Sequence, residues 1–416
     1  MKIAVIGGGP SGSVAAALLA RKGHDVVIFD EDNRPETIAG ESLVPGVIPI
    51  LRRLGLEDQV SKIGVHKPGV TFCTGERKEF AFSFTSLSKS YPQYAYNVPR
   101  PAFDRILQEC AMESGAHKVV AKAEFTVLPQ GDKLHLNPGT LSLIPFWKGE
   151  QPDLFIDATG RRRLCAKLFG IKAEVGPRKD VSHFAHFEGF HPESPSGQVR
   201  INRLENGWAW RIPLRGKMSF GIVMDHQSIS SLGEDPAERI EAAIRKDPRL
   251  RSETSGFRRV SEVGTYANYQ LISSRGYGEN WVAVGDAFGF VDPMLSPGVM
   301  VAMQSASILD KELDEQTLGV ALPRYSERVS HTLRSWMELI EFFYNGRIFE
   351  LQESGREYLS RHPRFPLGFV EGFMSRNMAG MASGFTTSSP WSRGVLRHAE
   401  RFVLGKRTGP SRHAIL

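Results

Sequence analysis

Cysteine is scarce in this sequence: its 416 residues include only three, Cys73, Cys110 and Cys165. They are scattered, odd in number and in no spacing that metal sites use, which excludes a disulfide-stapled scaffold and a cysteine-based zinc site. Isolated thiols of this kind are typical of a reducing compartment. We therefore expect reduced cysteines and a cytoplasmic protein.

Long apolar runs are missing as well. No stretch is both long enough and free enough of charge to span a bilayer, and the N-terminus opens directly on a strand pattern, so we expect neither a membrane span nor a signal peptide. Nothing in the sequence indicates nucleic acid as a partner, because zinc spacings, RNA-binding motifs and basic runs interleaved with aromatic residues are all lacking. His183 and His186 lie three apart in a strand-like run, which puts them on opposite faces, so we expect no metal site there.

The excess of positive charge is not spread evenly. The formal net charge is +6, and the stretch from Trp391 onward carries six basic residues against Glu400 alone. These basic residues are Arg393, Arg397, Arg401, Lys406, Arg407 and Arg412. The first three fall at i, i+4 spacing and would make one basic face of a helix. Two interpretations stay open: a solvated terminal helix, or a surface that docks to an acidic carrier protein or a membrane surface.

The most informative feature that is present lies at the N-terminus, which reads MKIAVIGGGPSG. Lys2–Ile6 has the pattern of a buried strand and Ser11–Arg21 that of a helix, and Gly7, Gly9 and Gly12 between them make G-x-G-x-x-G. The first glycine permits a tight turn, the second lets a pyrophosphate approach the backbone, and the third lets helix and strand pack closely. The helix N-terminal amides then face the phosphates. The pattern predicts a dinucleotide-binding βαβ unit.

Four further positions fit the same kind of cofactor. A second strand ends in Asp30, 18 residues after Gly12, where an acid suits the ribose hydroxyls of an adenosine. Downstream, one apolar strand ends in Asp157-Ala158-Thr159-Gly160-Arg161 and another in Gly285-Asp286, and Arg100 stands just before a helix. An acid at the carboxyl end of a strand can accept hydrogen bonds from a sugar-alcohol chain. The helix that opens near Gly298 would aim its positive end at the edge of a flavin that carries charge when reduced.

Taken in order, GGGPSG with Asp30, then Arg100, DATGR and GDAFGFVDP resemble the FAD-dependent enzymes built like p-hydroxybenzoate hydroxylase, over roughly residues 1–310. The resemblance implies FAD rather than NAD. The implied FAD contacts are Gly7, Gly9, Gly12, Asp30, Glu41, Ser42, Arg100, Asp286, Pro293 and Gly298. No second glycine-rich βαβ unit follows, so we expect electrons from a separate flavin reductase or from transiently docked NAD(P)H.

The resemblance also implies an α/β fold with a doubly wound, Rossmann-like FAD domain and an inserted antiparallel β-sheet substrate domain. We expect the FAD domain within residues 1–310, mainly 1–65, 96–180 and 260–310. The inserted sheet would take about 66–95 and 181–259. Residues 311–416 are expected to form a helical C-terminal region that ends in the basic tail, with a helix break near Pro323.

Two motifs narrow the group further. Residues 207–214 read GWAWRIPL, in which Trp208 and Trp210 share one face of a strand and Arg211 takes the other. Read from the residues alone, the pair is either a packed core face or a wide apolar wall. The segment, including Pro213, resembles the W-x-W-x-I-P signature of flavin-dependent halogenases, where the wall separates flavin and substrate compartments. Residues 40–45, GESLVP, are similar to the halogenases that act on phenols, pyrroles or alkyl carbons.

Lys67 is the candidate catalytic residue. In that halogenase group, GES is followed by K-x-G-x-x-F, and residues 67–72, KPGVTF, stand in this place. The resemblance implies that the lysine meets hypohalous acid and delivers the halogen to an electron-rich carbon. An ammonium can hydrogen-bond hypohalous acid, and the amine can form a haloamine. The alternative is a surface lysine in a turn beside Pro68 and Gly69.

The candidate halide site is the loop of residues 292–298, DPMLSPG, which corresponds to the family pattern D-P-x-F-S-x-G. In the family, backbone amides here hold the halide, which makes Ser296 and Gly298 the candidates. Leu295 replaces the usual phenylalanine, and Pro297 has no N–H to offer an anion. The glutamate that tryptophan halogenases place before the serine is absent, which disfavours free tryptophan as the substrate.

The sequence therefore predicts an FAD-dependent oxidoreductase that uses reduced flavin and oxygen, halogenase-like in build, on an electron-rich aromatic or carrier-bound substrate. One alternative is a monooxygenase (hydroxylase) or a dehydrogenase on the same scaffold. Another, of a different class, is a flavin-binding partner protein that modifies or matures another protein.

Overall fold

The N-terminal strand forms the centre of a parallel sheet in the computed structural model, which describes residues 1–75, 78–129, 131–190, 195–361, 367–404 and 414. In strand order this sheet contains β17 (Trp281–Ala283), β10 (Leu154–Asp157), β1 (Lys2–Ile6), β2 (Asp25–Phe29) and β7 (His117–Val119). All four neighbouring pairs are parallel. Ile3, Ala4 and Val5 are completely buried, as expected of a parallel sheet covered on both faces.

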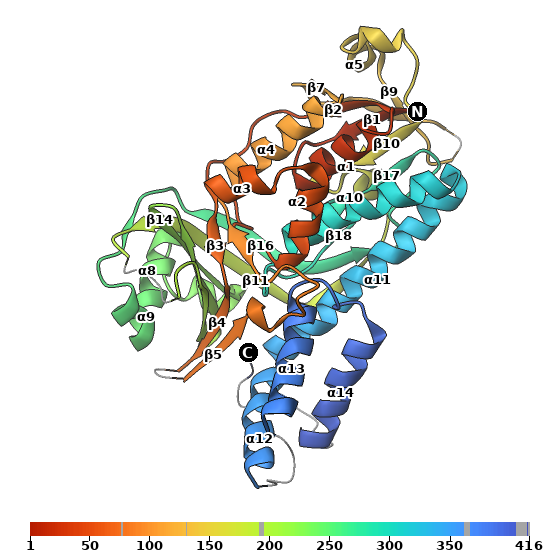
Figure 1. Ribbon diagram of the computed structural model, residues 1–416. Helices are drawn as coiled ribbons and strands as arrows, with labels where there is room; N and C mark the ends of the chain where they lie inside the picture. Colours follow the sequence, from red (N-terminus) through yellow and green to blue (C-terminus); the bar gives the residue numbers. More distant parts are fainter. Residues whose placement is uncertain (76–77, 130, 191–194, 362–366, 405–413, 415–416) are drawn as a thin grey trace.

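Helices cover this sheet (Figure 1). The first, α1 (Pro10–Ala20), packs against α4 (Arg100–Glu113) and α10 (Gly298–Glu315). Its small residues allow that close packing, and every residue from Ser11 to Ala20 is buried. Shorter helices flank the core: α2 (Ile48–Leu54), α3 (Glu57–Ile63), α5 (Pro138–Ser142) and α6 (Leu164–Leu168). Two small ladders pair β3 (Val65–Lys67) with β6 (Ala95–Asn97), and β8 (Phe125–Val127) with β9 (Leu134–Leu136).

A second, larger sheet lies beside the first (Figure 1). Its order is β18 (Gly289–Phe290), β16 (Gly264–Ser273), β11 (Ala173–Glu188), β14 (Lys217–Asp225), β13 (Gly207–Leu214), β12 (Val199–Leu204), β4 (Gly69–Thr74) and β5 (Lys78–Ser83), and β15 (Arg258–Arg259) pairs with β11. The pairs are antiparallel except β12 with β4, which is parallel. One face packs on α7 (His226–Ser230), α8 (Pro236–Lys246) and α9 (Pro248–Glu253), and the other faces the parallel sheet.

The C-terminal region is helical, as predicted. It contains α11 (Leu318–Tyr344), α12 (Arg347–Arg361), α13 (Leu367–Ala382) and α14 (Pro390–Leu404). In Figure 1, α11 runs alongside α10, and α12, α13 and α14 lie below it. The break expected near Pro323 is wrong, because α11 runs through this residue. Pro323 lies in the second turn, where the missing N–H removes one hydrogen bond close to the end of a long helix. The predicted architecture of a Rossmann-like unit, a substrate sheet and a helical region is confirmed, and the predicted domain boundaries stay a prediction.

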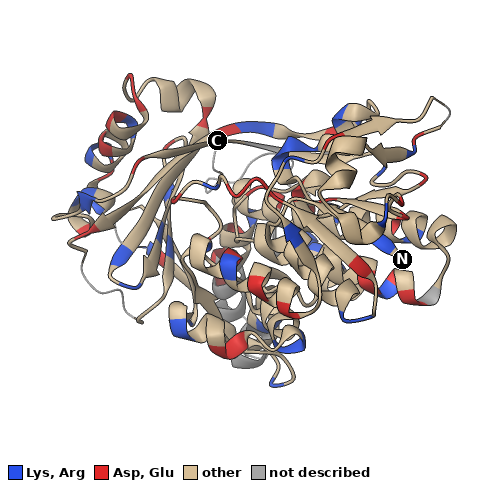
Figure 2. Cartoon of the chain, turned by 90° about the horizontal axis from the view of Figure 1, so that it is seen from above, with Lys and Arg blue, Asp and Glu red and all other residues tan. Residues whose placement is uncertain are grey.

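Part of the basic face predicted for the last helix forms ion pairs within the chain. Arg393 and Arg397 of α14 both pair with Glu338 of α11. Arg393 is half-buried, whereas Arg397 and Arg401 are exposed. Lys406, Arg407 and Arg412 lie outside the described residues. Figure 2 shows basic and acidic residues interspersed over the described chain rather than gathered by sign.

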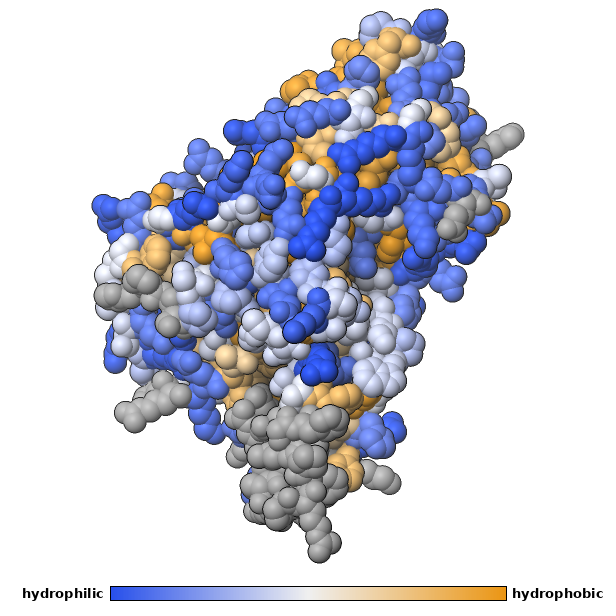
Figure 3. All heavy atoms as spheres, viewed as in Figure 1, coloured by the Kyte–Doolittle hydropathy of each residue, from blue (hydrophilic) through white to orange (hydrophobic). Residues whose placement is uncertain are grey.

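The visible surface is mostly hydrophilic, with scattered hydrophobic residues (Figure 3). None of the helices in the described ranges combines the length and the hydrophobicity that crossing a membrane requires. Cys73, Cys110 and Cys165 are buried free thiols.

Gly12 gives a direct test of the packing between β1 and α1. A Cβ at this position would lie 2.0 Å from the Gly7 carbonyl oxygen and 2.9 Å from the Ala158 methyl group. We expect Gly12→Ala to reduce the free energy of unfolding by about 1–3 kcal/mol, since overpacked cores cost that much. The measurement is urea unfolding of the protein without cofactor. Gly9→Ala is the matched control, because a Cβ at Gly9 meets nothing within 4 Å, and equal losses in both variants would contradict the packing argument.

Candidate functional site

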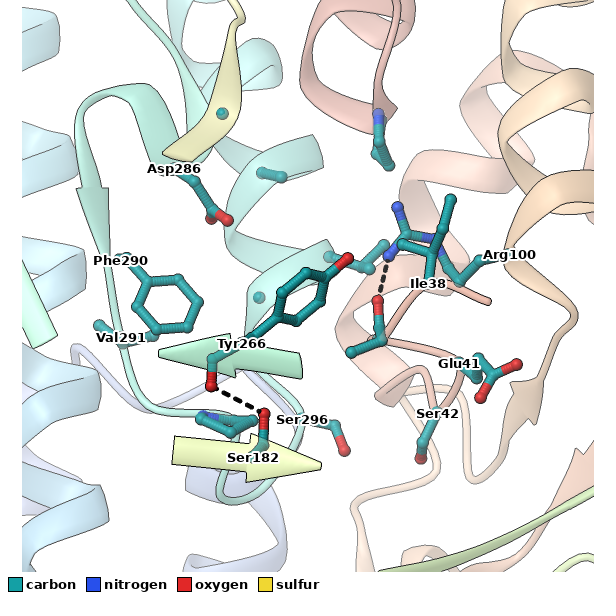
Figure 4. A pocket seen from close by; sticks show the side chains of 18 of the residues that line it. Ile38, Glu41, Ser42, Arg100, Ser182, Tyr266, Asp286, Phe290, Val291 and Ser296 are labelled. Atoms are coloured by element: carbon teal, nitrogen blue, oxygen red, sulfur yellow. Dashed lines mark hydrogen bonds between the residues drawn. The ribbon is translucent and has the colours of Figure 1, made fainter. Parts of the chain in front are cut away.

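A cavity of about 290 Å³ lies where the parallel sheet, the loop of residues 38–42 and the large sheet meet. Its walls come from segments far apart in sequence (Figure 4). Predicted site residues on the walls are Gly9, Glu41, Ser42, Arg100, Trp208, Trp210, Asp286, Pro293, Ser296 and Gly298. Gly7, Gly12, Asp30, Pro213 and Lys67 do not line it. The fold therefore brings most of the predicted residues to one place.

The glycine-rich end of the cavity fits a pyrophosphate. Gly7 has φ +104°, which favours glycine, and a Cβ there would lie 2.5 Å from the Ala158 carbonyl oxygen. Gly9 is the N-cap of α1 and has open space around it, so a ligand can approach the backbone and the first helical amides. These residues match the phosphate-binding part of FAD.

Asp30 follows β2 beside this glycine loop. Its carboxylate accepts the Gly8 N–H at 2.5 Å and the Arg34 guanidinium at 2.8 Å. Burial alone would raise the pKa of Asp30, but Arg34 and the Gly8 and Asp32 amides outweigh it and hold that pKa below its usual range. The side chain is thus an ionised acceptor, as a ribose contact requires.

Asp286 and Arg100 lie on opposite sides of the cavity (Figure 4). Arg100 is fixed by both carboxylate oxygens of Asp104, at 2.9 and 3.0 Å, and donates to the Ala39 carbonyl oxygen at 2.7 Å. Burial raises the pKa of Asp286 to about 6, although Arg161 and Arg100 counteract it. Helix α10 begins at Gly298, which also lines the cavity, so the unpaired amides of its first turn point toward the cavity. The arrangement fits the ribityl chain and ring of a flavin.

The two tryptophans of β13 face the cavity from the large sheet. Their ring centroids are 5.8 Å apart. Trp208 donates to the Tyr344 hydroxyl at 2.9 Å, and Trp210 donates to the Ser219 hydroxyl at 3.2 Å. Arg211 points to the other face, where it pairs with Glu253 at 2.5 Å, so the predicted alternation is confirmed. The pair forms an apolar wall of the site.

Lys67 is completely buried at the end of β3, so the surface-turn alternative is wrong. It pairs with Ala95 of β6 in a short ladder, which overrides the turn signal of the following proline and glycine. The Nζ atom donates to the Ser42 hydroxyl at 2.7 Å and to the Leu43 carbonyl oxygen at 2.8 Å. Burial lowers the pKa of Lys67 to about 7.

The amine opens on a second, small cavity of about 20 Å³. Its other walls are apolar: Val44, Val70, Phe72, Phe82, Phe84, Leu295, Phe343, Ala379 and Ala382. The two cavities are lined by residues that contact one another or are adjacent in sequence. Ser42 lines the large cavity and holds Lys67 of the small one, and neighbouring Leu295 and Ser296 line the small and the large cavity respectively.

The candidate halide loop offers fewer amides than its family pattern. Leu295 and Ser296 both have positive φ, at 69° and 59°. The Ser296 N–H is already taken by the Pro293 carbonyl oxygen at 2.8 Å, and the Met294 N–H by Asp292 at 2.9 Å. Because Pro297 has no N–H, the remaining donors lie mainly in the first turn of α10.

Sequence reasoning missed a buried network behind this loop. Asp292 is completely buried, and its Oδ1 accepts the Tyr344 hydroxyl at 2.9 Å while that hydroxyl accepts Trp208. The Arg178 guanidinium lies over the Tyr344 ring at 4.1 Å. No pattern in the sequence pointed to Tyr344, which lies at the end of the amphipathic helix α11, far from every motif. The network ties the halide loop to the tryptophan wall and to α11.

The two histidines singled out by the sequence have separate environments, as predicted. His183 contacts Thr265 at 2.9 Å and Arg239 at 3.3 Å, whereas His186 contacts Glu41 at 2.7 Å. Among the described residues there is no cluster of three or more potential metal ligands.

Asp292 predicts a pH dependence of stability. Burial raises the pKa of Asp292 to about 7, from about 3.9 in an unfolded chain. Between these values the folded protein holds a proton that the unfolded chain releases, so its stability falls as pH rises from about 4 to about 7. We expect Asp292→Asn to remove ~1–3 kcal/mol of that fall. Denaturant unfolding at several pH values measures it, and parallel curves for both proteins would contradict the assignment.

Two family models match the chain. The FAD binding domain matches residues 1–136, and the tryptophan halogenase model matches residues 85–348, more than half of the chain. FAD is thus the cofactor that the glycine loop and cavity accommodate. The predicted resemblance to flavin-dependent halogenases is confirmed.

Individual proteins agree with the family models. Flavin-dependent halogenase ascD of Acremonium egyptiacum is 30% identical over 73% of this chain, which spans 60% of that relative's length. A 1H-pyrrole-2-carbonyl-[peptidyl-carrier protein] chlorinase of Pseudomonas fluorescens is 24% identical over 82% of this chain and 83% of its own. The flavin-dependent brominase Bmp2 has the same fold, with a TM-score of 0.75 and 20% identity over 97% of this chain and all of Bmp2. A flavoprotein/dehydrogenase of Cytophaga hutchinsonii has a TM-score of 0.79 and 21% identity, over 98% of this chain and all of the other. By its family-model match and its sequence relatives, the chain belongs to the tryptophan halogenase family of flavin-dependent halogenases.

Proposed function

We propose that this protein is a flavin-dependent halogenase that modifies an electron-rich aromatic or pyrrole-type carbon. The observation that carries the proposal is the position of Lys67. Its amine is buried, Lys67 lines a small apolar pocket, and the amine contacts at 2.7 Å the hydroxyl of Ser42, a residue that also lines the FAD cavity. A lysine in a surface turn would instead have a solvated amine.

Reduced FAD, when bound, would supply two of the four electrons that reduce oxygen, and the halide ion would supply the other two as it is oxidised to hypohalous acid. The chain's own residues act on that acid. With a pKa of about 7, Lys67 has both an ammonium that can hydrogen-bond hypohalous acid and an amine that can accept its halogen. Ser42 orients the amine. Transfer to an aromatic carbon then replaces a C–H bond by a carbon–halogen bond and releases water.

The side chains around Lys67 favour an uncharged reacting group. The small cavity of about 20 Å³ has room for about one water molecule, so an aromatic ring would enter only if its walls moved apart. Apart from Lys67, the side chains around this cavity are aliphatic or phenylalanine. Such walls stabilise an aromatic ring through dispersion and edge contacts but offer nothing to a carboxylate or an ammonium. The similar chlorinase acts on pyrrole-2-carbonyl bound to a peptidyl carrier protein. A substrate delivered on a carrier arm fits these walls better than free tryptophan, whose ammonium and carboxylate would need polar partners.

The electrons come, in this proposal, from a separate flavin reductase or from transiently docked NAD(P)H, since the sequence has one glycine-rich βαβ unit. The acidic partner expected at the basic tail stays a prediction. Glu338 occupies two of the helical arginines, which leaves Arg401 and residues outside the described ranges for any docking.

A monooxygenase or dehydrogenase on the same scaffold is the second candidate. The observation that favours it is the shortage of amides in the halide loop, where Ser296 is internally bonded and Pro297 has no N–H. A partner protein without independent turnover remains the third. The product distinguishes the three candidates. A halogenase adds a halogen, a monooxygenase adds oxygen or a dehydrogenase forms a double bond, and a partner protein gives no product.

Replacement of Lys67 tests the halogenase proposal. The assay supplies reduced FAD, oxygen and bromide with indole or a phenol, and identifies products by mass. We expect brominated product from the wild type and at least a hundredfold less from Lys67→Met, because no amine is left to carry the halogen. FAD binding and oxidation of reduced FAD by oxygen should be unchanged in that variant.

The control for this experiment is Lys62→Met, which removes an exposed lysine from the same part of the chain. It should behave as the wild type does. Brominated product at wild-type levels from Lys67→Met would contradict the role of the lysine, and a gain of oxygen regardless of halide would favour the hydroxylase.

Pro297→Ala tests the halide loop. The variant restores one backbone N–H that a bound halide ion could accept. A missing donor to such a desolvated anion weakens its binding by on the order of 1–3 kcal/mol. We expect the KM for bromide to fall roughly tenfold or more in this variant. In the wild type, bromide should be used in preference to chloride, because bromide costs less to desolvate and is easier to oxidise. Pro236→Ala, at the start of α8 and away from the cavity, is the matched control, and an unchanged KM in Pro297→Ala would place the halide elsewhere.

A further inference from the structure

A buried line of hydrogen-bonding groups leads to the FAD cavity from the side of the large sheet. His186 Nε2 lies 2.7 Å from Glu41 Oε1, and His186 Nδ1 lies 3.1 Å from Lys217 Nζ. Glu41 and His186 are only 2% and 4% exposed, whereas Lys217 is half-buried beside an exposed turn. The three side chains come from a loop, from β11 and from β14.

Hydrogen-bond chemistry fixes the polarity of this line. A lysine ammonium has three donors and no acceptor, so Nδ1 of His186 accepts from Lys217. The ring proton of the neutral imidazole then sits on Nε2, which donates to the Glu41 carboxylate. Every group thus has a partner, in the order in which a proton can pass from solvent to Glu41.

Both ends of the line are held in place. The Glu41 carbonyl oxygen accepts the Val98 N–H at 2.7 Å, and the adjacent Ser42 forms a bridge with Asn97. Glu41 lies beside Ser42 on the cavity wall, across from Asp286 (Figure 4). At the other end, Lys217 opens β14 immediately after the exposed turn residues Arg215 and Gly216. The line therefore runs from the surface of the sheet to the cavity.

We propose that Lys217, His186 and Glu41 form a proton path to the FAD cavity. Oxidation of anionic reduced flavin to hydrogen peroxide by oxygen takes up one proton, and formation of hypohalous acid from peroxide and a halide ion takes up one more. A buried line of donors and acceptors can deliver such protons to the cavity wall. The proposal rests on FAD binding and not on halogenation, since a hydroxylase would need the same protons.

Each transfer balances. The Glu41 carboxylate takes the Nε2 proton of His186, and the imidazole takes a proton at Nδ1 from the Lys217 ammonium. The Glu41 carboxylic acid so formed gives its proton to an acceptor in the cavity, and solvent reprotonates the lysine amine. The ring is left with its proton on Nδ1, and Nδ1 must lose that proton to solvent and Nε2 must gain one before the starting tautomer returns.

The other histidine of β11 is a built-in control. His183 lies on the opposite face and contacts Thr265 and Arg239, neither of which leads to the cavity. The arginine cannot release a proton under ordinary conditions. Charged groups that act on the proposed path are Glu41 and Lys217 on either side of His186, with Arg100 near Glu41.

The first test is the rate at which oxygen oxidises reduced FAD bound to the protein, followed by stopped-flow absorbance between pH 6 and 9 without halide or organic substrate. His186→Gln keeps a donor for Glu41 but has no proton to pass on. We expect its rate to fall roughly tenfold or more and to lose the pH dependence of the wild type. Glu41→Gln should do the same. His183→Gln should match the wild type.

Two further measurements exclude a merely structural role. The affinity for FAD should be unchanged in His186→Gln. In the protein without FAD, ¹⁵N NMR of labelled histidine, with His186 assigned from the His186→Gln variant, should show the neutral Nε2–H tautomer. The proposal is overturned by wild-type kinetics and pH profile in His186→Gln, by loss of FAD affinity that accounts for the slower rate, or by the Nδ1–H tautomer. Because no halide is present, these outcomes do not depend on whether the protein halogenates anything.

Discussion

The site is arranged around the Lys67 amine, which is buried with no counter-ion among the described residues. Phenylalanine and aliphatic side chains surround it, and within the described part of the chain only a hydroxyl and a carbonyl oxygen accept its hydrogen bonds. Burial of a charge in such surroundings is costly, so the protonation equilibrium moves to about neutral pH. An amine of this kind can react with an electrophile that an ordinary lysine ammonium would not accept. The surrounding fold holds it close to the FAD cavity yet outside its lining.

That position requires segments from the whole chain. The loop before Ser42 extends from the FAD-type unit, β13 supplies the tryptophan wall, and residues 292–297 supply the candidate halide loop. Tyr344 of α11 then joins two of them by accepting from Trp208 and donating to Asp292. Leu295 and Ser296, whose φ angles are positive, lie in sequence between Asp292 of this network and the first turn of α10. The C-terminal helices thus contact the site directly, through the Tyr344 hydroxyl of α11.

The sequence predicted those parts that local patterns determine. The glycine loop, the strands that end in Asp157 and Asp286, and the alternation of Trp208, Trp210 and Arg211 follow from periodicity and from the needs of a phosphate-binding turn. The environment of Lys67 did not, because Pro68 and Gly69 look like a surface turn and the burying residues lie in β4, β5 and α11. The hydrogen bonds of His186 with Glu41 and of Tyr344 with Asp292 span 145 and 52 residues. No spacing rule reaches across such distances, so only the fold reveals them.

Titration of the Lys67 amine is the decisive measurement for the buried lysine. Heteronuclear NMR of the protein with ¹³C-labelled lysine follows the Cε signal of each lysine against pH, and the signal lost in Lys67→Met identifies the one of interest. We expect a midpoint for Lys67 near pH 7, well below the reference value of about 10.4 for a lysine side chain. A midpoint near 10.4 for Lys67 would mean that its amine is solvated or ion-paired, and would contradict the buried halogen-accepting lysine.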